Sequence, residues 1–198
     1  GHPRYSERFH KLPEQLRQGD NAFAQAFAQA YVEDWEALND DWQVFVHDLE
    51  HAYDFKRSAI DYAPGEQAVD GAKMIKVGAD RGGQNRGLRL EAGKRYQMSA
   101  EGRHQGDDML GDVPRIWTSE PNGVSFRYYQ GRPLGMLLAA VHPDQQLENR
   151  PSPLVEPTAI GLAGELVPAA TGTLFLRIND SAGELDNTVF LFTSDHGY

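Results

Sequence analysis

The sequence contains no cysteine, which excludes a disulfide framework and any chemistry that depends on a thiolate. Positive charge is also scarce, because 19 Lys and Arg residues face 29 Asp and Glu residues and the formal net charge is −10. Nucleic acids and anionic membrane surfaces both need basic patches, so this charge balance argues against either as a partner. No apolar run approaches the ~20 residues that a membrane-spanning helix requires, and we expect no membrane insertion.

The chain begins Gly1-His2-Pro3 and so lacks an initiating methionine. From this start we expect that an upstream part, either a leader or a whole domain, has been removed. We expect an exported protein that is secreted, periplasmic or at the cell surface. Its 198 residues, 40% of them hydrophobic, are enough for a packed core and argue against wholesale disorder.

The first third of the chain has the hydrophobic pattern of helices. Between Phe23 and Tyr53 the apolar residues recur in steps of three and four, which is typical of a helix that buries one stripe. We predict one helix over about 22–29, a second from near 33 to about 49, and an earlier helix or single turn within 5–17. Residues 1–64 are therefore predicted to form a helical segment of two or three helices.

After Pro64-Gly65 the pattern changes to short runs of β-branched and aromatic residues between Gly- and Pro-containing turns. No helical pattern interrupts these runs, which favours a β-sandwich or jelly roll over a βαβ fold. The predicted fold class is α+β in order, a helical segment followed by an all-β sandwich over 65–198. Segment 145–156 is predicted to be a long loop. The predicted strands are 73–78, 87–90, 95–100, 115–117, 124–129, 134–141, 159–162, 172–178 and 189–192.

Three separated segments of this strand series resemble, in order, the galactose-binding-like bacterial calcium lectins. Segment 87–102 (GLRLEAGKRYQMSAEG) is similar to the early strands of that family, and 131–141 (GRPLGMLLAAV) to the strand after its ligand loop. Segment 172–187 (GTLFLRINDSAGELDN) is similar to the penultimate strand and the calcium loop that follows it. The resemblance covers about 70–195 and implies a β-sandwich that binds carbohydrate with calcium. Many proteins with this sandwich bind no sugar.

The resemblance also implies a calcium site. In that family the ion is bound by the loop after the penultimate strand, by a backbone carbonyl and by sugar hydroxyls, which suits the preference of calcium for six to eight oxygens. Asp180 matches the first carboxylate ligand and Asn187 the first of two consecutive asparagines. Thr188 replaces the second asparagine, which should weaken the site. Glu184 stands at the position that supplies a carbonyl, where a side-chain change is tolerated.

Three further carboxylates could compensate for the missing asparagine oxygen. Asp186 lies in the same loop, while Asp107 and Asp108 follow Gly102 in a loop that should lie nearby in such a fold. The alternative is that segment 179–183 is only a turn, because Asn, Asp, Ser and Gly are favoured in turns for backbone reasons alone.

Aromatic side chains offer a second kind of ligand contact. Trp117 and Tyr129 are candidate ligand-binding residues, because a flat ring can cover the apolar face of a pyranose. The alternative is that these rings belong to the core, as large aromatics in strands usually do. Tyr128 and Tyr129 are adjacent in a predicted strand, so they must point to opposite faces of the sheet.

The helical segment carries two other resemblances. Segments 19–27 (GDNAFAQAF) and 35–46 (WEALNDDWQVFV) resemble the helical tail of thermolysin-like peptidase domains, although the metal-binding helix of that family is missing. His47 and His51 fit an H-x-x-E-H zinc pattern, in which two histidines share one helix face. A zinc peptidase also needs a third ligand and a larger surrounding domain, so a solvated helix edge is the competing interpretation.

We find no complete catalytic site in the sequence, since there is no G-x-S-x-G motif and no cysteine nucleophile. The sequence therefore predicts a non-catalytic module that binds carbohydrate, with calcium as its one candidate cofactor, or binds a protein partner. A first alternative is the accessory region of a larger metallopeptidase, inactive by itself. A second alternative is a purely structural or assembly domain. The oligomeric state is left open.

Overall fold

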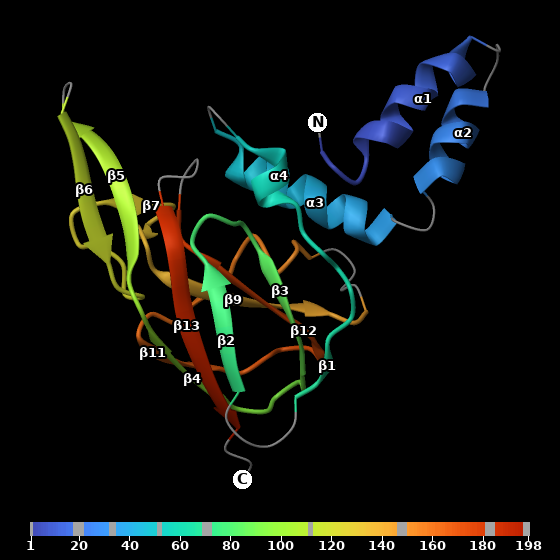
Figure 1. The fold of residues 1–198 in the computed structure, drawn as a ribbon. Coiled ribbons are helices and arrows are strands. Elements are labelled where there is room, and N and C mark those ends of the chain that lie inside the picture. The colour runs from blue at the N-terminus through green and yellow to red at the C-terminus, as the bar shows by residue number, and fades with distance from the viewer. Residues whose placement is uncertain are drawn as a thin grey trace.

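The computed structural model describes residues 2–17, 22–31, 35–50, 53–68, 73–110, 113–145, 150–180 and 185–195. Within these ranges it leaves out the side chains of 15–16, 22–23, 107–110, 113–115 and 185–195. The described chain consists of helices near the N-terminus followed by a two-sheet β-sandwich, as the sequence predicts (Figure 1). No helix in these ranges is long and apolar enough to cross a bilayer.

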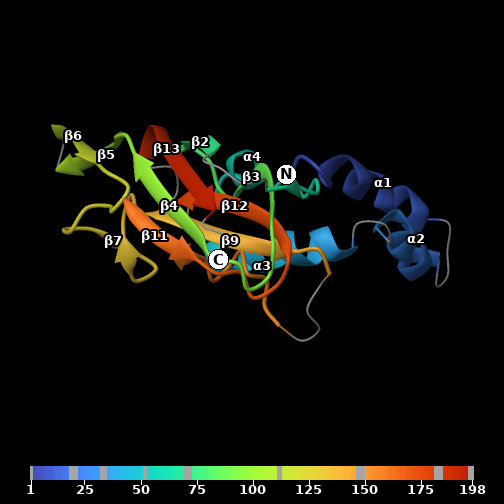
Figure 2. The same ribbon diagram turned by 90° about the horizontal axis from the view of Figure 1, so that it is seen from below.

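Four helices precede the sandwich: α1 (Ser6–Leu16), α2 (Ala22–Tyr31), α3 (Trp35–Asp48) and the short α4 (Phe55–Ser58). Helices α1 and α2 pack together through Tyr5, Leu12 and Tyr31 and extend beyond the sandwich (Figures 1 and 2). Helices α3 and α4 lie against the sandwich, and we call these two helices the cap. The Asp54 carboxylate caps α4, because it accepts hydrogen bonds from two backbone amides of the first turn.

The first sheet has the strand order β1-β3-β12-β9-β10. Its central strand β12 pairs antiparallel with β3 on one side and β9 on the other. Glycine at position 172 is required by close approach, since a Cβ there would lie 2.0 Å from the His142 carbonyl oxygen. The strand bounds are β1 (Glu66–Gln67), β3 (Gln84–Leu90), β9 (Leu137–Pro143), β10 (Thr158–Ala159) and β12 (Gly172–Ile178).

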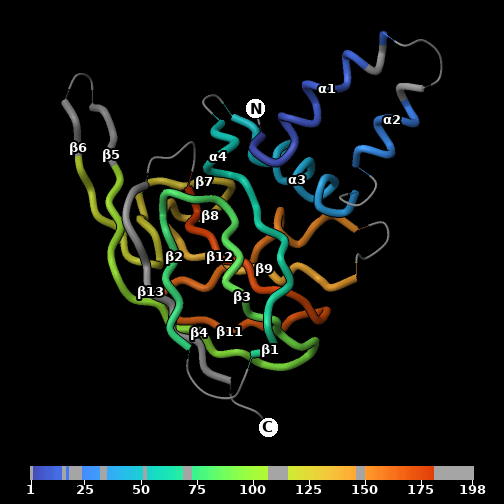
Figure 3. Tube along the Cα trace, turned by 45° about the vertical axis from the view of Figure 1, so that its right-hand side comes forward, coloured from blue at the N-terminus to red at the C-terminus, as the bar shows by residue number. Residues whose placement is uncertain are grey.

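The second sheet has the order β11-β4-β13-β5-β6, and β2 also pairs with β13. Strands β5 and β6 form a long hairpin beside the sandwich (Figure 3). A separate small hairpin joins β7 (Tyr128–Tyr129) to β8 (Arg132–Pro133). The remaining bounds are β2 (Lys73–Gly78), β4 (Tyr96–Glu101), β5 (His104–Leu110), β6 (Val113–Ser119), β11 (Ala163–Leu166) and β13 (Leu185–Asp195).

Strand β12 is buried on both of its faces, which explains its almost uninterrupted apolar sequence. Leu174, Leu176 and Ile178 belong to the core between the two sheets. Phe175 points to the opposite face, where it joins a second core that includes Val44 of α3. The cap and the sandwich therefore share a hydrophobic cluster, and the alternation of side chains along β12 produces both cores.

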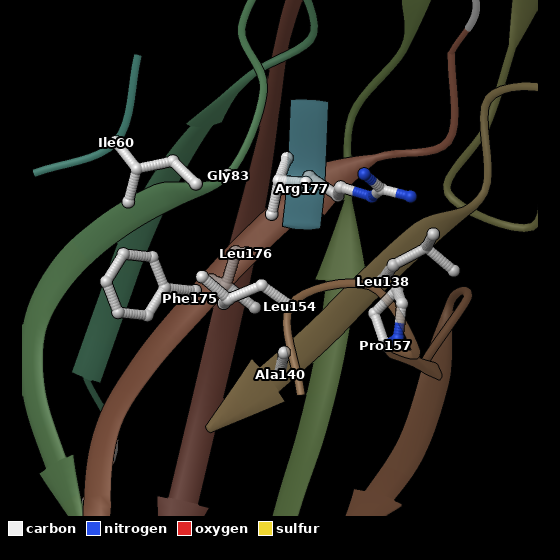
Figure 4. Close-up of a pocket in the computed structure, with 10 residues that line it drawn as sticks. Ile60, Gly83, Leu138, Ala140, Leu154, Pro157, Phe175, Leu176 and Arg177 are labelled. Atoms are coloured by element: carbon white, nitrogen blue, oxygen red, sulfur yellow. The ribbon is translucent and has the colours of Figure 1, made fainter. Parts of the chain in front are cut away.

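A small cavity remains between the cap and the first sheet (Figure 4). Its walls are apolar and include Ile60, Ala140, Leu154 and Phe175. The cavity volume is about 20 Å³, which is room for about one water molecule. This cavity is therefore a packing defect and not a binding site for an organic ligand.

Polar contacts fix the cap further. Asp41 accepts hydrogen bonds from the hydroxyls of Tyr5, at 2.9 Å, and Tyr62, at 3.0 Å, so one carboxylate joins α1 and α3 to the segment before β1. Asp40 of α3 is buried and pairs with His142 of β9 at 2.6 Å. These contacts satisfy polar groups that would be costly to bury unpaired.

Two of the predicted strands, 73–78 and 172–178, have the observed bounds. Others were wrong. Segment 159–162 is not one strand, because Gly161 has a φ of +64° and turns the chain from β10 in one sheet to β11 in the other. Of segment 124–129 only β7 is a strand. The stretch after Gly102, predicted as a loop, is strand β5, whose polar sequence lacks the usual β signature.

The imidazole of His104 is buried without a hydrogen-bond partner among the described residues. It is tightly enclosed, since a Cβ on Gly135 would lie 2.5 Å from its Nε2. Burial lowers the pKa of His104 to about 4, from the 6.5 of a free imidazole. The folded protein therefore holds this residue neutral at pH values at which the unfolded chain would bind a proton.

We predict that His104 makes the protein sensitive to acid. Stability from this residue is complete above pH 6.5 and falls between pH 6.5 and 4, because protonation then favours the unfolded chain. The loss should be about 3 kcal/mol, from 1.36 kcal/mol per pKa unit. The measurement is the unfolding free energy by urea at pH 7 and pH 4.5. His104→Leu should reduce the pH dependence, whereas His10→Leu, at an exposed position, should leave it unchanged.

Candidate functional site

A polar cleft lies where the cap meets the C-terminal end of β12 and the β7–β8 hairpin. Its volume is about 40 Å³, room for about three ordered waters. Four separate elements supply its walls, so sequence-distant residues meet there. We call it the cap cleft, and its principal residues are Asp48, Glu50, Arg57, Tyr129, Arg177 and Asp180.

An ion pair between Arg177 and Asp48 crosses the cleft. Arg177 lies on the face of β12 that meets the cap, and its Nη1 donates to the Asp48 carboxylate at 2.8 Å. The side chains are only 12% and 18% exposed, so solvent screens this pair weakly. Burial by itself would raise the pKa of Asp48, but Arg177, His47 and Gln130 outweigh it and hold that pKa below its ordinary value.

Gln130 occupies the tip of the β7–β8 hairpin in a left-handed conformation with a φ of +48°. With Gly131 at +75° it forms the two-residue turn that favours positive φ at both positions. Its amide Nε2 is 3.0 Å from the Asp48 carboxylate and 3.2 Å from the Tyr129 hydroxyl. A residue other than glycine is strained in this conformation, and such strain is concentrated at functional sites.

Tyr129 contributes a half-buried ring and a hydroxyl to the cleft. Burial raises the pKa of Tyr129, and a hydrogen bond with Glu50 raises it further. The hydroxyl therefore stays protonated and donates to the Glu50 carboxylate while it accepts from Gln130. Neighbouring Tyr128 is 63% exposed and does not line the cleft.

Asn179 anchors the hairpin that carries Tyr129 and Gln130. Its side chain is buried, and its Nδ2 lies 3.0 Å from each of three carbonyl oxygens, those of Tyr129, Arg132 and Pro133. Its backbone amide donates to the Met136 carbonyl and its carbonyl accepts from the Gly135 amide, each at 2.7 Å. The position of the cleft aromatic therefore depends on the residue that follows β12.

Asp180, the candidate first calcium ligand, forms an ion pair with Arg57 of α4. The Asp180 side chain is 1% exposed and that of Arg57 is 18% exposed. Arg57 also donates to the carbonyl oxygens of Asp80, at 2.8 Å, and Ala79, at 3.3 Å. The guanidinium thus supplies the positive charge beside Asp180, and a calcium ion bound there would have to displace it.

The other candidate metal ligands fall on two strands. Asp107 and Asp108 lie in β5, and Asp186, Asn187 and Thr188 lie in β13, which pairs with β5 from Leu185↔Gly106 onward. In the described register Asp186 and Asn187 face Gln105 and His104 of β5, Thr188 faces Gly78 of β2, and Asp107 and Asp108 pair with β6. The side chains of these five residues and the whole of Glu184 lie outside the described residues. Among the described side chains no group of three His, Asp or Glu could hold a metal ion. Calcium binding stays a prediction.

Trp117 does not line the cap cleft. Its ring is partly buried against the core between the sheets and covers Gly106, where a Cβ would lie 2.2 Å from the ring. Phe126 meets it edge-on at a centroid distance of 6.0 Å. Trp117 and Tyr129 therefore belong to different surroundings and do not form one aromatic platform.

His47 of the H-x-x-E-H pattern is paired with its neighbour Asp48, Nδ1 to Oδ1 at 2.7 Å. His51 lies outside the described residues, so the two-histidine geometry stays a prediction. The resemblance of α2 and α3 to a peptidase tail likewise stays a prediction.

Sequence reasoning missed most of the cap cleft. Asp48 and Arg57 lie more than 100 residues before Arg177, and none of the three belongs to a motif. Gln130-Gly131 is a weak two-residue turn signal between Tyr-Tyr and Arg-Pro, and it could have indicated the hairpin. Nothing in the sequence says that this turn lies against a helix 80 residues away.

No protein-family model and no curated protein matches the sequence. Among solved structures, one similar chain is described as "EclA N-terminal domain; PllA-like lectin". The sequence identity is 20% and the TM-score is 0.40. The likeness covers 62% of this chain and 95% of that chain.

We predict that Asn179→Asp destabilises the protein by about 3 kcal/mol, because a buried carboxylate would face three carbonyl oxygens in place of a donor. The measurement is urea unfolding at pH 7. The matched control is Asn122→Asp, since the Oδ1 of the exposed Asn122 accepts from the Leu162 amide at 2.8 Å and an aspartate oxygen can do the same. Equal losses in the two variants would contradict the assigned role of the Asn179 amide.

We predict that calcium and Arg57 compete for Asp180. Millimolar calcium added after EDTA should raise the unfolding temperature, with a free-energy gain of about 2.7 kcal/mol at a hundredfold excess over Kd. Arg57→Met should lose stability without calcium, because it leaves a buried carboxylate without its guanidinium, and should gain more from calcium. Asp180→Ala should abolish the response. A calcium response that is equal in all three proteins would rule out Asp180 as a ligand.

Proposed function

We propose that the chain is a non-catalytic module that binds carbohydrate in the cap cleft. The proposal depends on one observation above all: Asp48, Tyr129 and Arg177 line the cleft, and the amide of the adjacent Gln130, held in a strained conformation, bonds to all three. Carboxylate, amide and guanidinium groups are planar and present paired donors or acceptors. Vicinal sugar hydroxyls, which both donate and accept, match such pairs.

The cleft is fixed before any ligand arrives. The Arg57–Asp180 and Arg177–Asp48 ion pairs and the Asn179 anchor hold its walls, so little conformational entropy would be lost on binding. The volume of the cleft is small enough that the hydroxyls of one edge of a sugar ring would fill it. The half-buried Tyr129 ring supplies apolar contact beside these polar groups.

Two finer features belong to the same proposal. The sequence resemblance to calcium lectins supports a sugar as the ligand, and calcium bound near Asp180 would add a cation that sugar hydroxyls can coordinate. Calcium dependence is tested separately from the cleft itself, because EDTA removes the ion.

The test is a glycan array with the wild-type chain and the two variants Tyr129→Ala and Tyr128→Ala. Loss of the Tyr129 ring should weaken binding about tenfold, which corresponds to about 1.4 kcal/mol. Tyr128→Ala is the matched control, since it removes the same side chain from an exposed neighbour that does not line the cleft. The array should be read with calcium and with EDTA.

Glu50→Gln gives a second measurement on the same site, because it keeps the shape of the side chain and changes the acceptor for the Tyr129 hydroxyl. It should also weaken binding. No glycan bound by the wild type, or equal losses in Tyr128→Ala and Tyr129→Ala, would count against carbohydrate binding in this cleft.

A further inference from the structure

A broad open depression lies next to the cap cleft, between α4, the strands β2 and β3, and the turn that connects these two strands. Its volume is about 860 Å³, in the range of small-molecule sites. Arg57 and Arg81 line both the depression and the cap cleft, so the two hollows share a wall. A ligand in the cap cleft could therefore extend into the depression.

Two arginines of the depression lack a counter-charge. Arg81 and Arg86 form no ion pair with any carboxylate in the described part of the chain. Arg86 is half-buried, its Nε has no hydrogen-bond partner among the described residues, and its Nη2 donates to the uncharged Gln84 amide oxygen. Burial lowers the pKa of Arg86, and the nearby positive charge of Arg81 lowers it further. Two like charges are thus held together at a cost in free energy.

The backbone that carries these arginines is held in place. The Gly82 amide donates to the Arg57 carbonyl at 3.1 Å, while Arg57 binds the carbonyls of Ala79 and Asp80. The Gln84 side chain bonds both the amide and the carbonyl of Gly78, at 3.0 and 2.8 Å. The turn with Arg81 and the strand with Arg86 are therefore preorganised.

The charges around the depression leave it positive. Asp180 offsets the charge of Arg57, so four cations face three carboxylates. Two of the carboxylates already accept backbone amides, Asp54 from Lys56 and Asp61 from Ala63. A positive hollow is unusual in a chain of net charge −10. The four cations are Lys56, Lys76, Arg81 and Arg86, and the three carboxylates are Asp54, Asp61 and Asp80.

We propose that Arg81 and Arg86 bind the acidic group of an anionic saccharide, a carboxylate or sulfate, in this depression. An oxyanion would neutralise the repelling pair and accept hydrogen bonds from the guanidinium groups that line the depression. The anion site stands on the two arginines alone, whereas the saccharide as its carrier rests on the proposed function of the adjacent cleft.

The experiment is calorimetric titration with methyl glucuronide, methyl glucoside and inorganic sulfate at constant ionic strength. The glucuronide should bind at least about tenfold more tightly than the neutral glucoside, because hydrogen bonds between a guanidinium and a carboxylate are stronger than those to a neutral hydroxyl. Arg86→Gln and Arg81→Gln should each remove most of this difference. Arg103→Gln is the control, since Arg103 is 71% exposed, pairs with Glu120 and lies on another part of the surface.

A second readout does not need a ligand. Arg81→Gln should raise the unfolding temperature in anion-poor buffer, because it relieves the repulsion of Arg86, and this gain should disappear when the glucuronide is added. Arg81 is exposed on its turn, so we expect the Arg81→Gln variant to fold. Its unfolding curve measures any loss of stability.

The outcomes separate the two proposals. Glucuronide binding that survives Tyr129→Ala but is lost in Arg86→Gln supports the anion site whether or not the cap cleft binds sugar. Inorganic sulfate that binds as tightly as the glucuronide would overturn the saccharide as carrier and keep the anion site. Equal affinity for glucuronide and glucoside, or full glucuronide binding by Arg86→Gln, would overturn the anion site itself.

Discussion

The burial of β12 on both faces is the constraint on which the rest of the structure depends. Alternate side chains of one strand have to satisfy two environments, the core between the sheets through Leu174 and Leu176 and the cap through Phe175. A sandwich with one solvated face would not need a helix there. The face of the first sheet that carries Phe175 is apolar, and without α3 its side chains would be exposed to solvent. The cap covers this face. The cap and the sandwich therefore bury their apolar side chains against each other.

The polar end of β12 follows from the same alternation. Arg177 is two residues beyond Phe175 and so points to the same side, where the apolar contact with the cap ends. Its charge would be costly to bury alone, and Asp48 at the end of α3 meets it. Three residues after Arg177, Asp180 is likewise buried and forms an ion pair with Arg57 of α4. The cap cleft therefore forms at the border where the buried apolar face gives way to paired charges.

Local patterns were enough for the fold class and for the strands with strong β signatures, such as 73–78 and 172–178. They failed where the structure depends on contacts between residues that are distant in the sequence. The polar sequence of β5 has no strand signal, and pairing with β13 and β6 imposes the extended conformation. The candidate ligand Asp180 was selected from the resemblance to calcium lectins, but its partner Arg57 is 123 residues away and belongs to a four-residue helix. Gln130-Gly131 was only a weak turn signal, and the contacts of the Gln130 amide with Asp48 and Arg177 join residues 82 and 47 positions apart.

The distribution of charge gives the last step of the argument. A chain of net charge −10 has no general need for unpaired cations, and two other partly buried arginines where the cap meets the sandwich, Arg57 and Arg177, are matched with carboxylates. Arg81 and Arg86 break this rule at a place where the backbone is braced by Arg57 and Gln84. If their positive charge served only solubility, the side chains would gain more from full exposure to water, which screens repulsion. Retaining one of them half-buried beside the other is a cost that an anionic group at the site would offset, and it places that group next to the cleft with the most organised polar side chains in the described part of the chain.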